Sequence, residues 1–325
     1  TITSATNIQT ITYTAGASGT VGLTLTVTNA SGCSATNTSN VTINAKPATP
    51  AITPTPASVC ASSTGNSAAG PAGATSYAWS ITNGTITSAT NIQTITYSAG
   101  ASGTVGLTLV VTNASGCSAT NTSNVTINAA PATPAITPTP ATVCANSTGN
   151  SAAGPAGATT YAWSIVNGTI TSATNIQTIT YTAGASGTVG LTLTVTNASG
   201  CSATNTSNVT INAKPATPAI TPTPASVCAS STGNSAAGPA GATSYAWSIV
   251  NGTITSAVNI QTITYTAGAS GTVGLTLVVT NASGCSATNT VNVTINPNPN
   301  ATITAASSTP SGSTASEASP QTLSM

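Results

Sequence analysis

The stretch TVGLTLVVTNASGCSATNTSNVTIN, residues 104–128, decides the fold of this chain. Its first nine residues alternate, and one face carries Val105, Leu107, Leu109 and Val111. A period of two residues is typical of a half-buried β-strand. Threonine and valine suit a strand because branching at Cβ packs well on a pleated surface. The stretch therefore predicts strands separated by a turn, and no segment of the chain has helical periodicity with caps.

A second alternating segment, Tyr77-Ala78-Trp79-Ser80-Ile81, places Tyr, Trp and Ile on one face. A single Trp in a central strand of a sandwich is usually part of the core, so we expect this face to be buried and not to form a sugar-stacking platform. The predicted core tryptophans are Trp79, Trp163 and Trp247. Asn83-Gly84 follows and predicts a tight hairpin.

The same pattern returns at a fixed step along the chain. TITSATNIQTITY begins at Thr1, Thr85 and Thr169 and returns at Thr253 as TITSAVNIQTITY, a period of 84 residues. A period of this length corresponds to one small domain and not to the rung of a solenoid. With about seven strands in each period, spaced as in a β-sandwich, the expected fold class is all-β, a tandem array of Ig-like sandwiches.

Prolines mark the boundaries between repeats, because proline fixes φ and favours stiff, extended linkers. They place complete repeats at residues 46–129, 130–213 and 214–297. Residues 1–45 correspond to the C-terminal half of a repeat, and residues 298–325 to a linker or to the start of a divergent repeat.

A half sandwich exposes an apolar face and unpaired strand edges, which is costly in water. Two sources of cover for residues 1–45 remain open. Either the polypeptide continues upstream, or a neighbouring molecule supplies the missing strands by strand addition. Residues 300–304 loosely repeat residues 49–53, which makes the segment 298–325 the candidate donor.

Charge is nearly absent and excludes several classes of function. The chain carries Lys46, Lys214 and Glu317, with no histidine, arginine or aspartate, although 39% of its residues are hydrophobic. General acid–base catalysis needs a titratable group, metal sites need ligand clusters, and nucleic acid needs Lys and Arg. We therefore expect no enzyme, no catalytic residue, no metal, no cofactor and no nucleic-acid partner. No apolar run reaches the length of a membrane span, so we expect no membrane insertion of this segment.

Seven cysteines recur with the repeats and predict disulfides. They are Cys33, Cys60, Cys117, Cys144, Cys201, Cys228 and Cys285. Metal binding favours closely spaced pairs such as Cys-x-x-Cys, which are missing here. One cysteine per half-repeat in a charge-poor β array indicates disulfides and an oxidising compartment, which predicts a secreted or cell-surface protein.

Two registers of pairing fit the cysteine spacing. Pairing within each repeat joins Cys60–Cys117, Cys144–Cys201 and Cys228–Cys285, and leaves Cys33 with a partner outside the fragment. Pairing between repeats joins Cys33–Cys60, Cys117–Cys144 and Cys201–Cys228, and leaves Cys285 alone. We favour the first register because small sandwiches commonly carry their own disulfide. Buried free thiols are the remaining alternative.

The segment GATSYAWSITNGTIT, residues 73–87, together with residues 104–128, resembles the PKD-type (polycystic-kidney-disease) Ig-like sandwich. It is most similar to the PKD-like and Ig-like repeats of large secreted surface proteins of Bacteroidetes-type bacteria. The residues that carry the resemblance are Cys60, Tyr77, Trp79, Asn113, Gly116 and Cys117. Such domains often have acidic residues in the turn after the Trp. Here Ser80 and Asn83 stand there, which argues against a calcium role.

These observations favour a structural, non-catalytic segment of an extracellular fibre, stalk or adhesin. Near-zero net charge and strand edges without Lys or Glu favour self-association, with neighbours in the same chain or with fibre subunits. Two other functions stay open. One is a module that binds surface glycans or another carbohydrate, and the other is a spacer within a larger secreted enzyme.

Overall fold

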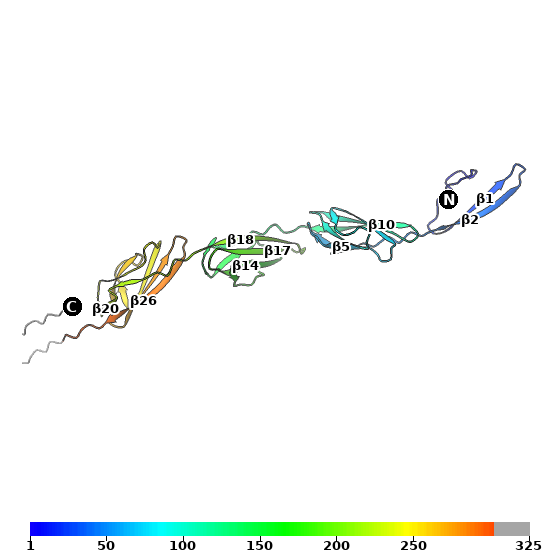
Figure 1. The fold of residues 1–325 in the computed structure, drawn as a ribbon. Coiled ribbons are helices and arrows are strands. Elements are labelled where there is room, and N and C mark those ends of the chain that lie inside the picture. The colour runs from blue at the N-terminus through cyan, green and yellow to red at the C-terminus, as the bar shows by residue number, and fades with distance from the viewer. Residues whose placement is uncertain (302–325) are drawn as a thin grey trace, which may run out of the picture. The chain divides into compact units, whose positions relative to one another are not determined.

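The computed structural model describes residues 1–301, and this range contains strands and turns but no helix (Figure 1). The expected all-β class is confirmed. The part of the chain that the structure describes ends before most of segment 298–325, so the proposed donor strand around residues 300–304 lies largely outside it.

The repeat 46–129 contains eight strands. They are β3 (Thr53–Thr55), β4 (Ser58–Cys60), β5 (Asn66–Ala69), β6 (Ser76–Thr82), β7 (Gly84–Ile86), β8 (Thr94–Ala99), β9 (Thr104–Thr112) and β10 (Ser118–Asn128). The two long strands β9 and β10 are the stretch with the clearest alternation. The short strands β3 and β4 carry too few residues for any period to be read from the sequence.

The eight strands form two four-stranded sheets, in the orders β3-β5-β8-β7 and β4-β10-β9-β6. Neighbouring strands are antiparallel, except that β4 runs parallel to the end of β10. In that parallel pair Asn128, the last residue of β10, lies opposite Cys60. This register places Cys60 at one end of the sandwich.

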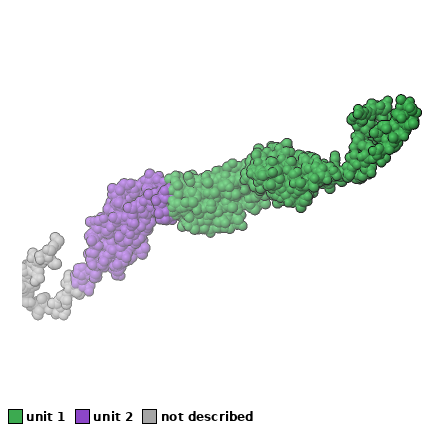
Figure 2. All heavy atoms as spheres, turned by 45° about the vertical axis from the view of Figure 1, so that its right-hand side comes forward, with its two compact units in different colours: residues 1–143, 147–184, 188–210 green, residues 144–146, 185–187, 211–325 purple. Residues whose placement is uncertain are grey.

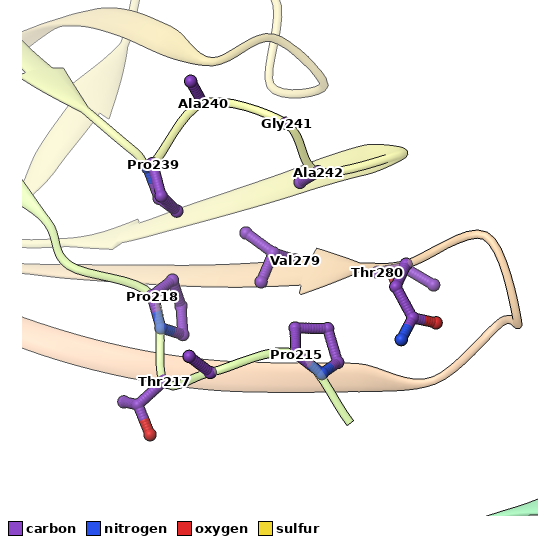
Figure 3. Close-up of a pocket in the computed structure, with 11 residues that line it drawn as sticks. Pro215, Thr217, Pro218, Pro239, Ala240, Gly241, Ala242, Val279 and Thr280 are labelled. Atoms are coloured by element: carbon purple, nitrogen blue, oxygen red, sulfur yellow. The ribbon is translucent and has the colours of Figure 1, made fainter. Parts of the chain in front are cut away.

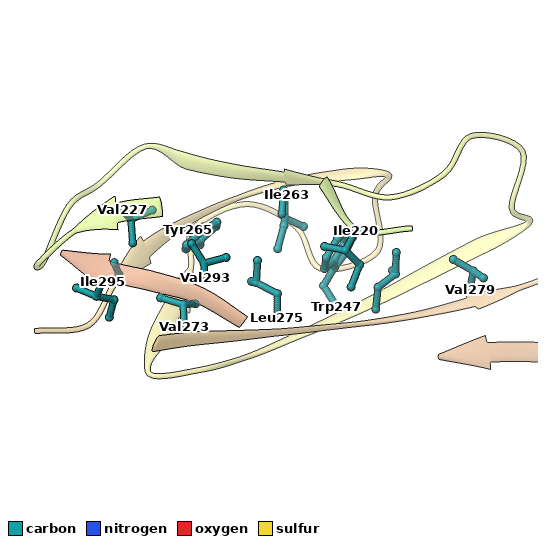
Figure 4. Close-up of a cluster of buried hydrophobic side chains, with 13 residues drawn as sticks. Ile220, Val227, Trp247, Ile263, Tyr265, Val273, Leu275, Val279, Val293 and Ile295 are labelled. Carbon is teal, nitrogen blue, oxygen red and sulfur yellow. The ribbon is translucent and has the colours of Figure 1, made fainter. Parts of the chain in front are cut away.

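The core lies between the two sheets. The first sheet contributes Ile95 and Tyr97 and the second contributes Leu107 and Leu109, all with 0% exposure. Figure 4 shows the equivalent cluster in the repeat 214–297, where side chains from both sheets point toward one another. The burial pattern of β9, alternately buried and half-buried, repeats the period of two in its sequence.

The tryptophans lie in these cores and their indole groups are satisfied. Trp79 is 5% exposed, and its Nε1 donates to the carbonyl of Ile92 at 3.0 Å. Trp163 and Trp247 are equally buried, at 5%, and donate to Ile176 and Ile260. A ring held in this way cannot offer its face to a sugar.

The predicted Asn83-Gly84 hairpin is wrong. Strand β7 pairs with β8 in the first sheet, whereas β6 belongs to the second, so the chain changes sheets at this point. Asn83 has φ of 54°, and its Nδ2 donates to the carbonyls of Ser102 and Thr104 at 2.7 and 2.9 Å. Asn83 suits this crossover because asparagine tolerates the left-handed φ found there, and Gly84 suits it because a Cβ at that position would lie 2.6 Å from the carbonyl oxygen of Ser98.

The other two complete repeats have the same strands at the same positions. The repeat 130–213 has β11 (Thr137–Thr139), β12 (Thr142–Cys144), β13 (Asn150–Ala153), β14 (Thr160–Val166), β15 (Gly168–Ile170), β16 (Thr178–Ala183), β17 (Thr188–Thr196) and β18 (Ser202–Asn212). The repeat 214–297 has β19 (Thr221–Thr223), β20 (Ser226–Cys228), β21 (Asn234–Ala237), β22 (Ser244–Val250), β23 (Gly252–Ile254), β24 (Thr262–Ala267), β25 (Thr272–Thr280) and β26 (Ser286–Asn296).

Within residues 1–45, β1 (Gly19–Thr28) and β2 (Ser34–Ile43) form a hairpin and are the counterparts of β9 and β10. Leu25, Val27 and Val41 are 63%, 56% and 40% exposed, whereas the equivalent residues of the next repeat are buried. Within the described residues no second sheet covers this apolar face. The sequence of the hairpin is that of a core strand pair, and its surroundings alone make it exposed.

Figure 2 colours the two compact units into which the chain divides. The first comprises residues 1–143, 147–184 and 188–210, and the second comprises residues 144–146, 185–187 and those from 211 onward. Each disulfide, and each turn contact given below, lies inside one of these units.

Candidate functional site: the junction between successive repeats

Two disulfides join neighbouring repeats. Cys60 pairs with Cys201 and Cys144 pairs with Cys285, each across a sequence separation of 141 residues. The favoured pairing within repeats, Cys60–Cys117, Cys144–Cys201 and Cys228–Cys285, is therefore absent from the structure, and so is the alternative register Cys33–Cys60, Cys117–Cys144 and Cys201–Cys228.

Strand geometry explains why pairing within a repeat fails. Cys60 lies beside Asn128 at the end of β10, whereas Cys117 immediately precedes its first residue. The 11 residues of β10 span about 35 Å at roughly 3.3 Å each. The Cα atoms of the bridged Cys60 and Cys201 are 5.6 Å apart. The two cysteines of one repeat thus lie at opposite ends of the sandwich, and neither can reach the other.

The same argument excludes the second register. Cys144 is followed by Ala145, whose N–H donates to Asn212 at the end of β18 at 2.9 Å. Cys144 therefore lies at the end of its sandwich where β18 finishes. Cys117 lies at the start of β10 in its repeat. A pairing predicted from distance along the sequence takes no account of the end of the strand at which each sulfur lies.

In each junction the bridged cysteine of the following repeat, Cys201 or Cys285, is the last residue of a turn with the sequence Asn-x-x-Gly-Cys. In the turn from Asn197 to Cys201, Asn197 Oδ1 accepts hydrogen bonds from the backbone N–H groups of Ser199 and Cys201 at 3.1 and 3.0 Å. The Asn197 N–H donates to the Cys201 carbonyl at 2.9 Å. Gly200 has φ of 78°, which a Cβ would make unfavourable. The turn is thus rigid and holds the sulfur in one place.

This turn also contacts the preceding repeat. Asn197 Nδ2 donates to the carbonyl of Ala129 at 2.9 Å, and Cys201 Sγ lies 3.7 Å from the carbonyl oxygen of Asn128. Cys201 is 1% exposed. A single asparagine side chain therefore shapes the turn through Oδ1 and attaches it to the neighbouring repeat through Nδ2. The second junction has the same contacts from Asn281 and Cys285 to Ala213 and Asn212.

Three cysteines are free thiols in the described structure: Cys33, Cys117 and Cys228. The turn that ends in Cys117 is already docked, because Asn113 Nδ2 donates to Ala45 at 2.9 Å and Cys117 Sγ is 3.5 Å from the Asn44 carbonyl. Beside it lies a hollow of about 710 Å³ lined by Ala15, Gly16, Ala17, Ile43, Asn44, Ala45, Lys46 and Cys117. In a complete repeat the segment after β4 occupies the equivalent place, where Ser62 donates to Gly100 at 2.8 Å.

A smaller hollow recurs near the proline linker of each complete repeat. Figure 3 shows the one in the repeat 214–297, between Pro215 and Pro218 of the linker, Pro239 and Ala242 of a loop, and Val279 of β25. Its volume is about 220 Å³, below the roughly 300 Å³ at which small-molecule sites begin. Its lining carries no charged group. We assign it no ligand.

The described residues hold no cluster of three or more metal-ligating His, Cys, Asp or Glu side chains. Across residues 1–301 there is no helix with the length and apolar character needed to cross a bilayer. Among residues 1–301, reactive side chains recur together at the cysteine junction.

Fold and junction together define a class of protein, a tandem array of all-β, Ig-like sandwich repeats. The sequence model of the PKD-like domain matches residues 46–127, 130–211 and 214–317. The chain belongs to this family, and the resemblance read from the Tyr-x-Trp strand and the Asn-x-x-Gly-Cys turn is confirmed. No curated protein sequence matches the chain.

Solved structures of multidomain chains are similar in part. They include the D1–D4 ectodomain fragment of ICAM-5, with 15% identity over 86% of this chain and 84% of that chain and a TM-score of 0.35. A Ca2+-stabilized adhesin from an Antarctic bacterium that binds ice has 14% identity over 85% and 82%, also with a TM-score of 0.35. The Bacteroides ovatus mixed-linkage glucan protein SGBP-B has 13% identity over 74% and 65%, with a TM-score of 0.17. These values are too low to transfer a function.

Proposed function

We propose that this chain is a structural, non-catalytic segment of an extracellular fibre, stalk or adhesin, in which disulfides tie each repeat to the next. The observation that carries the proposal is the pairing Cys60–Cys201 and Cys144–Cys285, which joins neighbouring repeats and closes none of them on itself. Such bridges form and persist in oxidising compartments, so we place the chain outside the cytoplasm, secreted or at the cell surface.

The bridges stabilise the array more than a bridge inside one repeat would. Each closes a loop of 141 residues. In the chain-entropy description a loop of this size lowers the entropy of the unfolded chain by the equivalent of about 5 kcal/mol, against about 4 kcal/mol for a loop of half the length. Small sandwiches have limited cores, so a constraint shared between neighbours matters for each of them.

The composition suits exposure to changing surroundings. Charged residues make up 1% of the chain, so there is little to titrate as pH changes and little for salt to screen. The same lack of charge removes the repulsion that keeps copies apart and supports self-association. Both properties fit a structural element outside the cell.

A role in binding glycans has no specific support among the described residues. The aromatic platform it would need is missing at the tryptophans, because Trp79, Trp163 and Trp247 are each 5% exposed and hydrogen-bonded through Nε1. We therefore do not propose it as a second function.

The test is to trap cysteine states in the native host at harvest. Intact cells are quenched in acid to stop thiol–disulfide exchange, the extracted chain is then alkylated under denaturing conditions near neutral pH, where thiols react, and it is mapped by mass spectrometry before and after reduction. We expect Cys60, Cys144, Cys201 and Cys285 to become alkylated only after reduction. Immunogold labelling of the same cells should place the repeats outside the membrane. Alkylation of all four as free thiols, or label in the cytoplasm, would refute the proposal.

A further inference from the structure

Each complete repeat begins with a linker that contains three Thr-Pro steps. The linkers are KPATPAITPTPAS at residues 46–58, APATPAITPTPAT at 130–142 and KPATPAITPTPAS at 214–226. Segments rich in threonine or serine together with proline are typical of O-glycosylated stalks. Such a composition has this meaning only if the hydroxyl groups are accessible, and in these linkers they are.

The backbone of the linker is extended and is held against its sandwich. The residue before a proline is restricted to extended angles, so each Thr-Pro step keeps its threonine out of a helical conformation. In the first linker Asn121 Nδ2 donates to the carbonyl of Pro50 at 2.9 Å, and Ser67 Oγ donates to the carbonyl of Thr55 at 3.3 Å. Its last part is the edge strand β3. The linker is therefore a fixed ridge on the surface.

The prolines of this ridge face the sandwich and its threonines face solvent. Pro50 is buried and Pro54 is half-buried, whereas Thr49, Thr53 and Thr55 are exposed. The division follows from the period of two in an extended chain. The other two linkers expose the equivalent threonines, which are Thr133, Thr137, Thr139, Thr217, Thr221 and Thr223.

The hydroxyl groups of these linker threonines have no hydrogen-bond partner within residues 1–301. Thr87 and Thr96 on the first sheet differ, because they are equally exposed but their Oγ1 atoms bond to each other at 2.8 Å. The same pair recurs in the other complete repeats at 2.8 Å. A bonded hydroxyl must lose its partner before it can react, whereas a linker hydroxyl is free to turn toward an enzyme.

We infer that the linker threonines are sites of O-linked glycosylation, with Oγ1 of Thr49, Thr53 and Thr55 and of their counterparts as the acceptors. The sugar comes from an activated glycosyl diphosphate through a transferase that binds the extended ridge. The inference rests on the proposed extracellular function and deepens it by naming a modification of the chain.

The transfer is a substitution at the anomeric carbon of the sugar. The threonine Oγ1 attacks this carbon, and the bond between the carbon and the phosphate oxygen breaks. The diphosphate leaves with the electron pair of that bond, and the hydroxyl proton passes to a base of the transferase. Nothing is oxidised or reduced. The chain supplies only the acceptor oxygen, so its near lack of titratable side chains is no obstacle.

Sugars at the linkers give the chain the hydration that charged side chains give to other proteins. Charged residues make up only 1% of this chain. Glycans are bulky and solubilising, and on β3 they also shield an exposed sheet edge from pairing with other strands. They leave the outer faces of the sheets uncovered, so the proposed self-association keeps these surfaces.

The test is to map sugars on the chain from its native host. The chain is digested, and the peptides that cover the three linkers are fragmented by electron transfer, which leaves glycosidic bonds intact. We expect mass shifts of one or more monosaccharide units on the linker threonines, and loss of these shifts after alkaline β-elimination. Thr87 and Thr96 are the matched controls and should carry no shift, because they are exposed but bonded.

Variants expressed in the same host locate the acceptors. The triple change Thr49→Ala, Thr53→Ala and Thr55→Ala should remove the mass shifts of the first linker and leave those of the other two. Thr87→Ala should remove none. Circular dichroism and recovery of the Cys60–Cys201 peptide check that each variant is folded.

Three results would overturn the inference: linker peptides without sugar in the native chain, sugar on asparagine alone, or modification of Thr87 and Thr96 as extensive as that of the linkers. The cysteine peptides and the immunogold label are read separately from the sugars. An unmodified linker in a chain with intact bridges outside the membrane would therefore sink the modification and leave the proposed structural function in place.

Discussion

The disulfide loops 60–201 and 144–285 overlap in sequence. When a single chain is unfolded by pulling on its two ends, this overlap should shorten the contour length of the unfolded chain. With both disulfides closed, the shortest covalent path from Cys60 to Cys285 passes through Cys201 and Cys144. Only residues 144–201 then extend between those points. At roughly 3.5 Å per residue this segment spans about 200 Å, against about 790 Å for the whole of residues 60–285. Reduction of both bridges should therefore lengthen the unfolded chain by about 590 Å.

Single substitutions should give a strongly non-additive result. Cys201→Ser opens one bridge, but the path can still cross from Cys144 to Cys285, so the gain is only about 95 Å. Cys285→Ser should give the same small gain through the remaining Cys60–Cys201 bridge. The double variant should recover the full gain of about 590 Å, because neither shortcut remains.

Optical tweezers with handles on cysteine-free terminal tags can measure these lengths, with and without reductant. Cys117→Ser is the matched control and should leave the contour unchanged, because Cys117 is a free thiol. If the bridges instead closed within repeats, loss of Cys117 would open one of them and lengthen the chain by about 200 Å. That result would refute the junction described here.

Three further predictions concern stability. Leu109→Ala should lower the free energy of unfolding of its repeat by about 2–5 kcal/mol in urea titrations, because the side chain is fully buried. Leu25→Ala, the equivalent change at a residue 63% exposed, should stay within about 0.5 kcal/mol, and equal losses would contradict the burial argument. Tyr97→Phe should stabilise its repeat by about 1–3 kcal/mol, because the buried hydroxyl has no hydrogen-bond partner among the described residues. Burial also raises the pKa of Tyr97 above 10.0, so the unfolded state loses its proton first as pH rises past that value. Stability should then fall with pH above about 10 in the parent and less steeply in the Phe variant, and equal slopes would show that this hydroxyl is not buried. Asn197→Ala should cost about 1–3 kcal/mol, since it removes the contact to Ala129 and two bonds inside the turn. Hydrogen exchange should speed up at that turn, and unchanged protection there would count against its anchoring role.

The strands that sequence reasoning placed well are those with one face in a core. Alternation over the nine residues of β9 predicts the buried face correctly, because a pleated strand inverts its side chains at each residue. The same alternation places Trp79 in the core, where it is 5% exposed. Strands β3 and β4 have three residues each, too few to show a period, so they could not be read in this way.

The disulfide pairing could not be read from cysteine spacing, because spacing says nothing of which end of a strand each sulfur occupies. The decisive fact is the parallel register of β4 with the end of β10, which places Cys60 beside Asn128. Parallel pairing of two segments far apart in sequence has no local signature. The Asn-x-x-Gly-Cys turn is recognisable as a family motif, but nothing in its sequence indicates that its asparagine contacts the previous repeat.

The staggered bridges also determine what a protease can accomplish. A cut at any single peptide bond between Cys60 and Cys201 leaves the two pieces joined through that disulfide. A cut further along, up to Cys285, leaves them joined through the bridge from Cys144. Between Cys144 and Cys201 both bridges hold. Over this whole region a molecule with one cut would keep its mass until it meets a reductant, so a single break in the backbone releases no fragment.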